Sequence, residues 1–212
     1  MKKIQLTCFA QTGNAYKVAL MLNLCGAKWE PVFVDFFNRE TQTPAYRQIN
    51  EMGEVPVLTD GDKVLSQSGA ILHYLADKYG RFGARTKDEG YEILRWILWD
   101  NHKLTSYIGT CRFLLLFAKT GQTEVTDFLA ARSKSALKVL EAHLRDADFV
   151  VGDRPTIADI SICGYLFWPD EIGVSWQDYP AIGAWLDRIK ALEGWVHPYE
   201  LMPGHPLPGG TD

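Results

Sequence analysis

A short polar loop near the N-terminus carries side chains that can hold an anion. Gln11, Thr12 and Asn14 lie between a predicted strand and a predicted helix, so their side chains and the first N–H groups of that helix face the same place. Thr12 is also typical of a helix N-cap, which on residue type alone is the commoner role. The loop therefore predicts either an anion-binding position with a hydroxyl beside it or a simple cap.

Two later segments have the same character. Pro56 stands at the start of a predicted strand, where its missing N–H is harmless. A trans peptide is the commoner state, whereas a cis peptide would turn the Val55 backbone outward to pair with an extended peptide ligand. Gln67 and Ser68 open a predicted helix, where an amide, a hydroxyl and helix N–H groups could clamp a carboxylate, although Ser68 could also serve as a cap.

Apolar periodicity and turn residues predict the elements that position these side chains. The N-terminal part reads as β-α-β, a polar connection, then β-β-α, with its first two strands parallel. We expect strands at 4–8, 31–36, 55–59 and 64–65, helices at 15–25 and 68–79, and a short helix at 43–49.

Strand signals largely vanish after residue 79. Residues 80–88 have the turn residues and charge of a linker, so we expect domains at 1–79 and 89–212. The second should be a helical bundle. Its helices are expected at 92–118, 126–147, 157–167 and 181–192, followed by a Pro- and Gly-rich tail without regular structure.

Composition excludes several classes of function. The chain has 212 residues, 47% hydrophobic and 23% charged, with a net charge of −4, so it can bury a core and has no basic surface for nucleic acid. No segment reaches membrane-spanning length. The four cysteines form no CxxC and no metal-ligand spacing, so we expect a reduced, cytoplasmic protein without a metal site.

Four segments together resemble a known family. Residues 12–18, 50–58 and 67–71 look like the glutathione site of soluble glutathione transferases of a bacterial type with a hydroxyl at the catalytic position, and residues 152–159 look like that family's buried capping motif. In that motif Thr156 would cap helix amides and Asp159 would reach back to the Thr156 N–H. The resemblance implies an α/β thioredoxin-like N-terminal domain, an all-α C-terminal helical bundle, glutathione as co-substrate, a small hydrophobic electrophile and a homodimer.

The resemblance also implies roles for single residues. Thr12 occupies the place of the hydroxyl that faces the glutathione sulfur, with Asn14 and then Gln11 as alternatives. Family members more often carry serine, tyrosine or cysteine there, and the extra methyl of threonine restricts the hydroxyl's direction. The implied glutathione-binding residues are Gln42 at the glycyl end, Glu54, Val55 through its backbone, and Gln67 and Ser68 at the γ-glutamyl end.

The electrophile is expected against the long helix. Tyr107, Thr110 and Phe113 could line an apolar pocket there, although aromatic residues at helical spacing are more often core. Two other functions stay open at this point: a non-catalytic glutathione-binding or assembly module of the same fold, and a thiol-disulfide oxidoreductase. The absence of CxxC weakens the latter, and Cys8 lies too early, in the strand, to attack a disulfide from the helix start.

Overall fold

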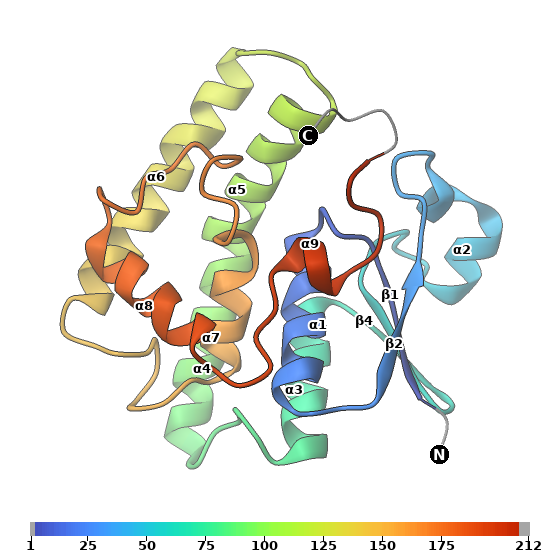
Figure 1. Ribbon diagram of the computed structural model, residues 1–212, viewed down its shortest axis with the longest axis horizontal. Coiled ribbons are helices and arrows are strands. Elements are labelled where there is room, and N and C mark those ends of the chain that lie inside the picture. The colour runs from blue at the N-terminus through green and yellow to red at the C-terminus, as the bar shows by residue number, and fades with distance from the viewer. Residues whose placement is uncertain (1–2, 208–212) are drawn as a thin grey trace. The chain divides into compact units, whose positions relative to one another are not determined.

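The computed structural model describes residues 3–207, which divide into two compact units (Figure 1). Within these residues the first unit combines 3–81 with 193–207, and the second is Phe82–Leu192. The sequence-based division assigned the tail to the helical half, whereas its described part groups with the N-terminal half. Residues 208–212 of the expected tail lie outside the described residues.

A four-stranded mixed sheet forms the centre of the first unit. Its strands are β1 (Ile4–Cys8), β2 (Trp29–Phe33), β3 (Val57–Asp60) and β4 (Lys63–Ser66), in the order β2-β1-β3-β4. β1 and β2 are parallel, while β3 is antiparallel to both β1 and β4. The parallel pair needs a crossover, and α1 (Gly13–Leu24) supplies it. The predicted β-α-β, β-β-α order is confirmed.

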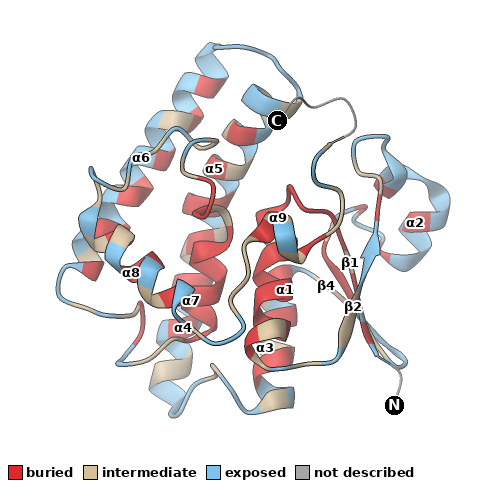
Figure 2. Cartoon of the chain, viewed as in Figure 1, coloured by how far each residue is buried: buried red, intermediate tan, exposed pale blue. Residues whose placement is uncertain are grey.

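The helices of the first unit are α1, α2 (Pro44–Ile49), α3 (Ser68–Tyr79) and the short α9 (Pro198–Leu201). α1 packs against both α3 and α9. Nearly all of α1 is buried (Figure 2), as expected from a helix that is apolar on most sides. α9 corrects the prediction of a tail without regular structure, because Pro198 at its first turn and His197 at its N-cap start a helix there.

The second predicted strand is shifted. We expected it at 31–36, but β2 ends at Phe33 and the chain then turns. The cause is tertiary: Val34 is buried, and the Phe36 ring stacks on Phe9 with ring centroids 4.9 Å apart. The apolar run thus continues the core of the first unit without continuing the sheet.

The second unit is helical. It contains α4 (Lys87–Trp99), α5 (Thr105–Arg112), α6 (Glu124–Leu144), α7 (Ile157–Ile162) and α8 (Pro180–Lys190). The long helix predicted at 92–118 begins five residues earlier and is interrupted by π-helical turns at Asp100–Leu104 and Phe113–Phe117. The first of these π-helical turns contains the buried Asp100, whose carboxylate accepts hydrogen bonds from the Thr105 and Ser161 hydroxyls, each 2.7 Å long. Across the described residues, no helix combines the length and apolar character needed to cross a membrane.

Candidate functional site

Three segments that are distant in sequence meet at one end of the sheet. Val57 pairs with Thr7 on one side and with Ser66 on the other. Continuing each ladder by two residues brings Val55 opposite Phe9 and opposite Ser68. Phe9 and Val55 indeed belong to the same apolar cluster. The polar loop at 11–14, the segment before β3 and the start of α3 therefore converge, as the family resemblance implied for the three motifs.

Two helices begin at this end. β1 and β4 run in the same direction because each is antiparallel to β3, so α1 and α3, which follow them, start at the same edge. Neither helix has an acidic residue in its first turn. Their N-terminal N–H groups and the positive ends of their dipoles thus favour an anionic ligand at this edge.

Thr12 occupies the N-cap position of α1 but does not cap with its side chain. Its backbone is extended, and its carbonyl accepts from the Tyr16 N–H. The hydroxyl forms no hydrogen bond within residues 3–207, and the residue is only 7% exposed. By contrast, the hydroxyls of Thr43, Thr86 and Thr123 each accept a helix N–H at their own caps. The capping interpretation of the Thr12 hydroxyl is therefore wrong.

The two neighbouring amides differ in what they bind. Gln11 is buried, and its Nε2 donates to the Gly204 carbonyl at 2.7 Å. The Asn14 Oδ1 is buried and has no hydrogen-bond partner in the described part of the chain. Gln11 is thus held by the tail, whereas Asn14 and Thr12 keep side-chain polar atoms that no described residue uses.

The Val55–Pro56 peptide is cis, the rarer of the two alternatives weighed from sequence. Val55 is half-buried. Its N–H and C=O make no hydrogen bond to any residue between 3 and 207. The backbone of Val55 therefore has both groups available for an extended ligand.

Glu54 and Gln67 connect the second and third segments. Gln67 Nε2 donates to Glu54 Oε2 at 3.0 Å. The Glu54 carbonyl accepts from the Tyr46 hydroxyl at 2.9 Å and from Asn50 Nδ2 at 2.8 Å, which fixes this part of the chain. Gln67 has a φ of 67°, a left-handed conformation that costs a residue with a Cβ roughly 1–3 kcal/mol and is typical of ligand clamps.

Ser68 is the first residue of α3, and Gln67 takes the N-cap position. Ser68 is 6% exposed, and its hydroxyl forms no hydrogen bond with the described residues. The capping interpretation of Ser68 is therefore wrong as well. Its hydroxyl and the first N–H groups of α3 are thus both left for an anionic ligand.

Arg47, in the polar connection, is a residue that the sequence analysis did not single out, and it contacts the predicted residue Gln42. Gln42 Nε2 donates to the Gly53 carbonyl at 3.3 Å, and Gln42 Oε1 accepts from Arg47 Nη2 at 2.7 Å. Arg47 also donates to the Glu51 carbonyl. An exposed cation joined to Gln42 is suited to a carboxylate. In the sequence, Arg47 stood out only as a positive charge within the short helix expected at 43–49.

The residues expected to face the electrophile lie on α5 and the turn that follows it. Tyr107 is half-buried, with the Arg132 guanidinium 5.3 Å from its ring centroid. Thr110 and Phe113 are exposed. The three follow one another at intervals of three residues, so they lie on neighbouring turns of one helical stretch.

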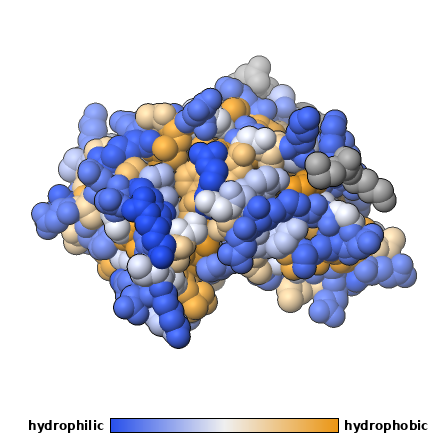
Figure 3. Space-filling model, turned by 90° about the horizontal axis from the view of Figure 1, so that it is seen from below, coloured by the Kyte–Doolittle hydropathy of each residue, from blue (hydrophilic) through white to orange (hydrophobic). Residues whose placement is uncertain are grey.

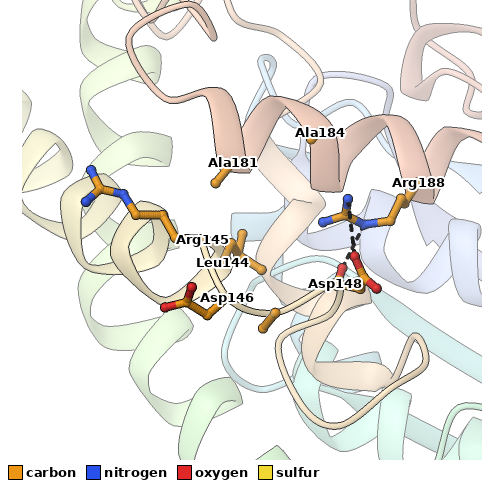
Figure 4. Close-up of a pocket in the computed structure, with 8 residues that line it drawn as sticks. Leu144, Arg145, Asp146, Asp148, Ala181, Ala184 and Arg188 are labelled. Carbon is orange, nitrogen blue, oxygen red and sulfur yellow. Dashed lines mark hydrogen bonds and ion pairs between the residues drawn. The ribbon is translucent and has the colours of Figure 1, made fainter.

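Two cavities lie within the second unit. One, of about 430 Å³, lies between the end of α6 and α8, where Arg188 donates to the Asp148 carbonyl (Figure 4). The other, of about 320 Å³, is lined by α5, the 113–117 turn, α6 and residues 170–174. Tyr107, Thr110 and Phe113 line neither cavity.

Cys8 is poorly suited to thiol chemistry. It is fully buried at the end of β1, and burial raises the pKa of its thiol to about 12. At neutral pH the thiol stays protonated, and the thiolate is the nucleophilic form. This weakens the thiol-disulfide oxidoreductase alternative further.

Comparison with known proteins identifies the family. A family profile described as "Glutathione S-transferase, N-terminal domain" matches residues 4–77, and one described as "Glutathione S-transferase, C-terminal domain" matches 106–193. The probable glutathione S-transferase GSTF1 of Oryza sativa is 31% identical, over 86% of this chain and 89% of the relative. The chain belongs to the glutathione S-transferase family.

Solved structures of other glutathione S-transferases agree. The enzyme from Pseudomonas fluorescens is 32% identical, with a TM-score of 0.87, over 93% of this chain and 99% of that one. The enzyme from Burkholderia graminis, solved with two glutathione molecules bound per subunit, is 26% identical, with a TM-score of 0.81, over 98% and 90%. The predicted thioredoxin-like and all-helical halves and the transferase function, with glutathione as co-substrate, are confirmed.

Proposed function

We propose that this glutathione S-transferase activates glutathione through the Thr12 hydroxyl and transfers it to a small hydrophobic electrophile, a chemistry that serves detoxification. One observation carries the proposal: Thr12 lies at the start of α1, and its hydroxyl is not used for capping. Asn14 is the second candidate, because it lies in the first turn of α1 and its side-chain NH₂ can donate a hydrogen bond to the sulfur.

The reaction needs a thiolate. A free thiol has a pKa near 8.5, and the thiolate is the form that attacks. A hydroxyl hydrogen bond, aided by the N-terminus of α1, lowers that pKa by roughly one to two units. The sulfur then forms a bond to the electrophilic carbon, and the leaving group departs with its electron pair. The thiol proton has already left to solvent.

We assign different residues to the cysteinyl, γ-glutamyl and glycyl parts of glutathione. We assign the backbone of Val55 to the cysteinyl unit, since its N–H and C=O can pair with an extended peptide. Ser68 and the first N–H groups of α3 would hold the γ-glutamyl carboxylate, with Gln67 and Glu54 beside its ammonium group. Gln42, with the Arg47 cation bonded to it, would hold the glycyl carboxylate.

A pair of substitutions separates the Thr12 hydroxyl from the Thr12 methyl. Thr12→Val keeps the branched shape and removes the hydroxyl, while Thr12→Ser keeps the hydroxyl. With a chromogenic aryl halide, we expect Thr12→Val to lower kcat at neutral pH by roughly 10- to 100-fold and to raise the pKa of the bound thiol by about one to two units. Thr12→Ser should stay within about threefold of the parent enzyme.

The outcome with Asn14 decides between the two donors. If Thr12→Val keeps its activity while Asn14→Leu loses it, Asn14 is the donor and the Thr12 assignment is wrong. If the purified protein neither binds glutathione nor gains thermal stability from it, the whole proposed mechanism fails.

We also propose Tyr107, Thr110 and Phe113 as residues that face the electrophile. Their spacing along α5 and the following turn supports a shared direction, and Thr110 and Phe113 are exposed. Phe113→Ala should raise the KM for the aryl halide several-fold and leave the KM for glutathione unchanged. Equal changes in both constants would contradict this role.

A homodimer is the proposed assembly. Apolar side chains reach the protein surface in several places (Figure 3). α4 exposes Tyr91, Leu94 and Leu98, and α6 exposes Phe128 and Val139, each set at spacings that share one helix face. We expect sedimentation to give a dimer for the parent protein and a monomer for Leu98→Glu. A monomeric parent protein would refute the assembly.

A further inference from the structure

The last described residues form a strap over the first unit. We define the C-terminal strap as residues 193–207, which include α9. Asn23 Nδ2 donates to the Gly194 carbonyl at 3.3 Å, and the Tyr16 hydroxyl donates to the Val196 carbonyl at 2.9 Å. α9 packs on α1 (Figure 1). The strap thus follows α1 from its C-terminal end toward its start.

The strap then reaches the loop that carries Thr12. The Ala10 N–H donates to the Pro203 carbonyl at 2.7 Å, and Gln11 Nε2 donates to the Gly204 carbonyl, also at 2.7 Å. Both donors are buried residues directly before Thr12 in the chain. The two bonds join consecutive residues of the loop to consecutive residues of the strap, so they fix the loop's position and its rotation.

At Gly204 the strap passes close to the side chain of Phe33 on β2. Gly204 has a φ of 94°, and a Cβ built there would lie 2.7 Å from Phe33 Cε2 on β2. The left-handed backbone favours glycine, and a Cβ there would force either the strap or the exposed Phe33 ring to shift. Gly204 is also the residue whose carbonyl accepts from Gln11 Nε2.

We infer that the C-terminal strap positions the catalytic loop, with Gln11 and Gly204 acting as positioning residues that aim the Thr12 hydroxyl at the glutathione sulfur. The inference rests on the proposed function of Thr12. Thr12 has no side-chain capping bond, so the direction of its hydroxyl depends on how the backbone of its loop is placed. A hydroxyl displaced by a fraction of an ångström loses much of its hydrogen bond to the sulfur, because such bonds depend steeply on distance and angle.

The test compares two glycine substitutions. Gly204→Ala introduces a Cβ against Phe33, while Gly121→Ala introduces one at a similar left-handed position, φ 69°, with nothing within 4 Å. We expect Gly204→Ala to raise the pKa of the bound glutathione thiol, read from thiolate absorbance, by about half to one unit. The rate at neutral pH should fall roughly three- to tenfold and recover at high pH. Gly121→Ala should match the parent enzyme in both.

A second variant, Gln11→Met, removes the donor of the hydrogen bond between Gln11 and the Gly204 carbonyl. The substitution keeps the length of the side chain. It should shift the thiol pKa in the same direction, and the double variant should shift it by less than the sum, since both changes break one contact. Hydrogen exchange of the Ala10 amide reports independently whether the strap has moved, because that amide donates to Pro203.

Three results would overturn the inference, and they are distinguishable. If Ala10 exchanges faster in Gly204→Ala but the thiol pKa equals that of the parent enzyme, the strap has only a structural role. If the Ala10 amide exchanges as slowly in Gly204→Ala as in the parent enzyme, that substitution has not moved the strap. Gln11→Met then decides, and an unchanged pKa of the bound glutathione thiol in Gln11→Met refutes the inference. If the parent enzyme itself leaves the thiol pKa of glutathione at its ordinary value, the proposed role of Thr12 fails, and the role of the strap fails with it.

Discussion

Asp159 should be among the most sensitive residues for stability, because one buried carboxylate receives four hydrogen bonds. Its Oδ1 accepts from the Val150 N–H at 2.8 Å and from Trp185 Nε1 at 2.9 Å. Its Oδ2 accepts from the Thr156 N–H at 2.8 Å and from the Thr156 hydroxyl at 3.1 Å. Asp159 is fully buried. The predicted capping motif is thus confirmed, and it also joins α8 to the loop before α7.

The cost of Asp159→Ala follows from the donors it leaves behind. Two backbone N–H groups and the indole N–H of Trp185 lose their acceptor inside the protein. Each buried unsatisfied donor costs about 1–3 kcal/mol. We therefore expect a loss of about 4–6 kcal/mol in the free energy of unfolding, which is a large part of a total of roughly 5–15 kcal/mol.

Asp159→Asn should fall between Asp159→Ala and the parent protein. The amide oxygen can replace Oδ1 and keep its two bonds, while the amide NH₂ replaces Oδ2 and cannot accept from the Thr156 N–H. We expect a loss of about 2 kcal/mol. Asp153→Ala is the matched control, because its side chain is 84% exposed and its ion pair with Arg85 should contribute less than about 1 kcal/mol.

Equilibrium unfolding in urea, followed by circular dichroism at one protein concentration, measures all three variants. The expected order of stability is Asp153→Ala, then Asp159→Asn, then Asp159→Ala. The reasoning is refuted if Asp159→Ala lies within about 1 kcal/mol of the parent protein, or if Asp159→Asn is the less stable of the two.

Two further predictions concern charge. Hydrogen bonds from Lys78 and Tyr74 lower the pKa of Asp60, so their stabilisation is present above the unfolded pKa and is lost as pH falls through the folded one. Asp60→Asn should thus cost about 1 kcal/mol at pH 7, and this cost should shrink as the pH is lowered and Asp60 becomes protonated, by urea unfolding at a series of pH values; a constant cost would contradict this. Glu171→Gln removes the carboxylate paired with the buried Arg112 and should cost about 2 kcal/mol, lowering Tm by several degrees, whereas an unchanged Tm would show that the pair adds nothing.

Local chemistry made much of the site predictable from the sequence. The order of strands and helices followed from apolar periodicity, whereas the convergence of residues near Thr12, Val55 and Ser68 was implied by the family resemblance. The capping motif at Thr156 and Asp159 was readable because its two hydrogen bonds join residues three positions apart. The order of the elements and the capping motif depend on residues that are close in the chain.

What could not be predicted depends on contacts between distant residues. Whether the Thr12 hydroxyl caps its helix is decided by tertiary packing and not by residue type. The shifted end of β2 reflects the stacking of Phe36 on Phe9. The π-helical turns within the long predicted helix keep its apolar pattern, so periodicity does not reveal them. The proline- and glycine-rich tail gave no sign that it binds Ala10 and Gln11.

The first unit is discontinuous in sequence, and this affects how it folds while the chain is being synthesised on the ribosome. Residues 3–81 emerge first, but residues 193–207 emerge only after all of Phe82–Leu192. Domains generally fold as units during translation, N-terminal first. Here the sheet and α1 can assemble early, whereas Ala10 and Gln11 can form their hydrogen bonds to Pro203 and Gly204 only after the last residues have been synthesised. A nascent chain halted after the helical unit would therefore contain every residue assigned to bind glutathione and still lack the segment that holds Ala10 and Gln11 in place.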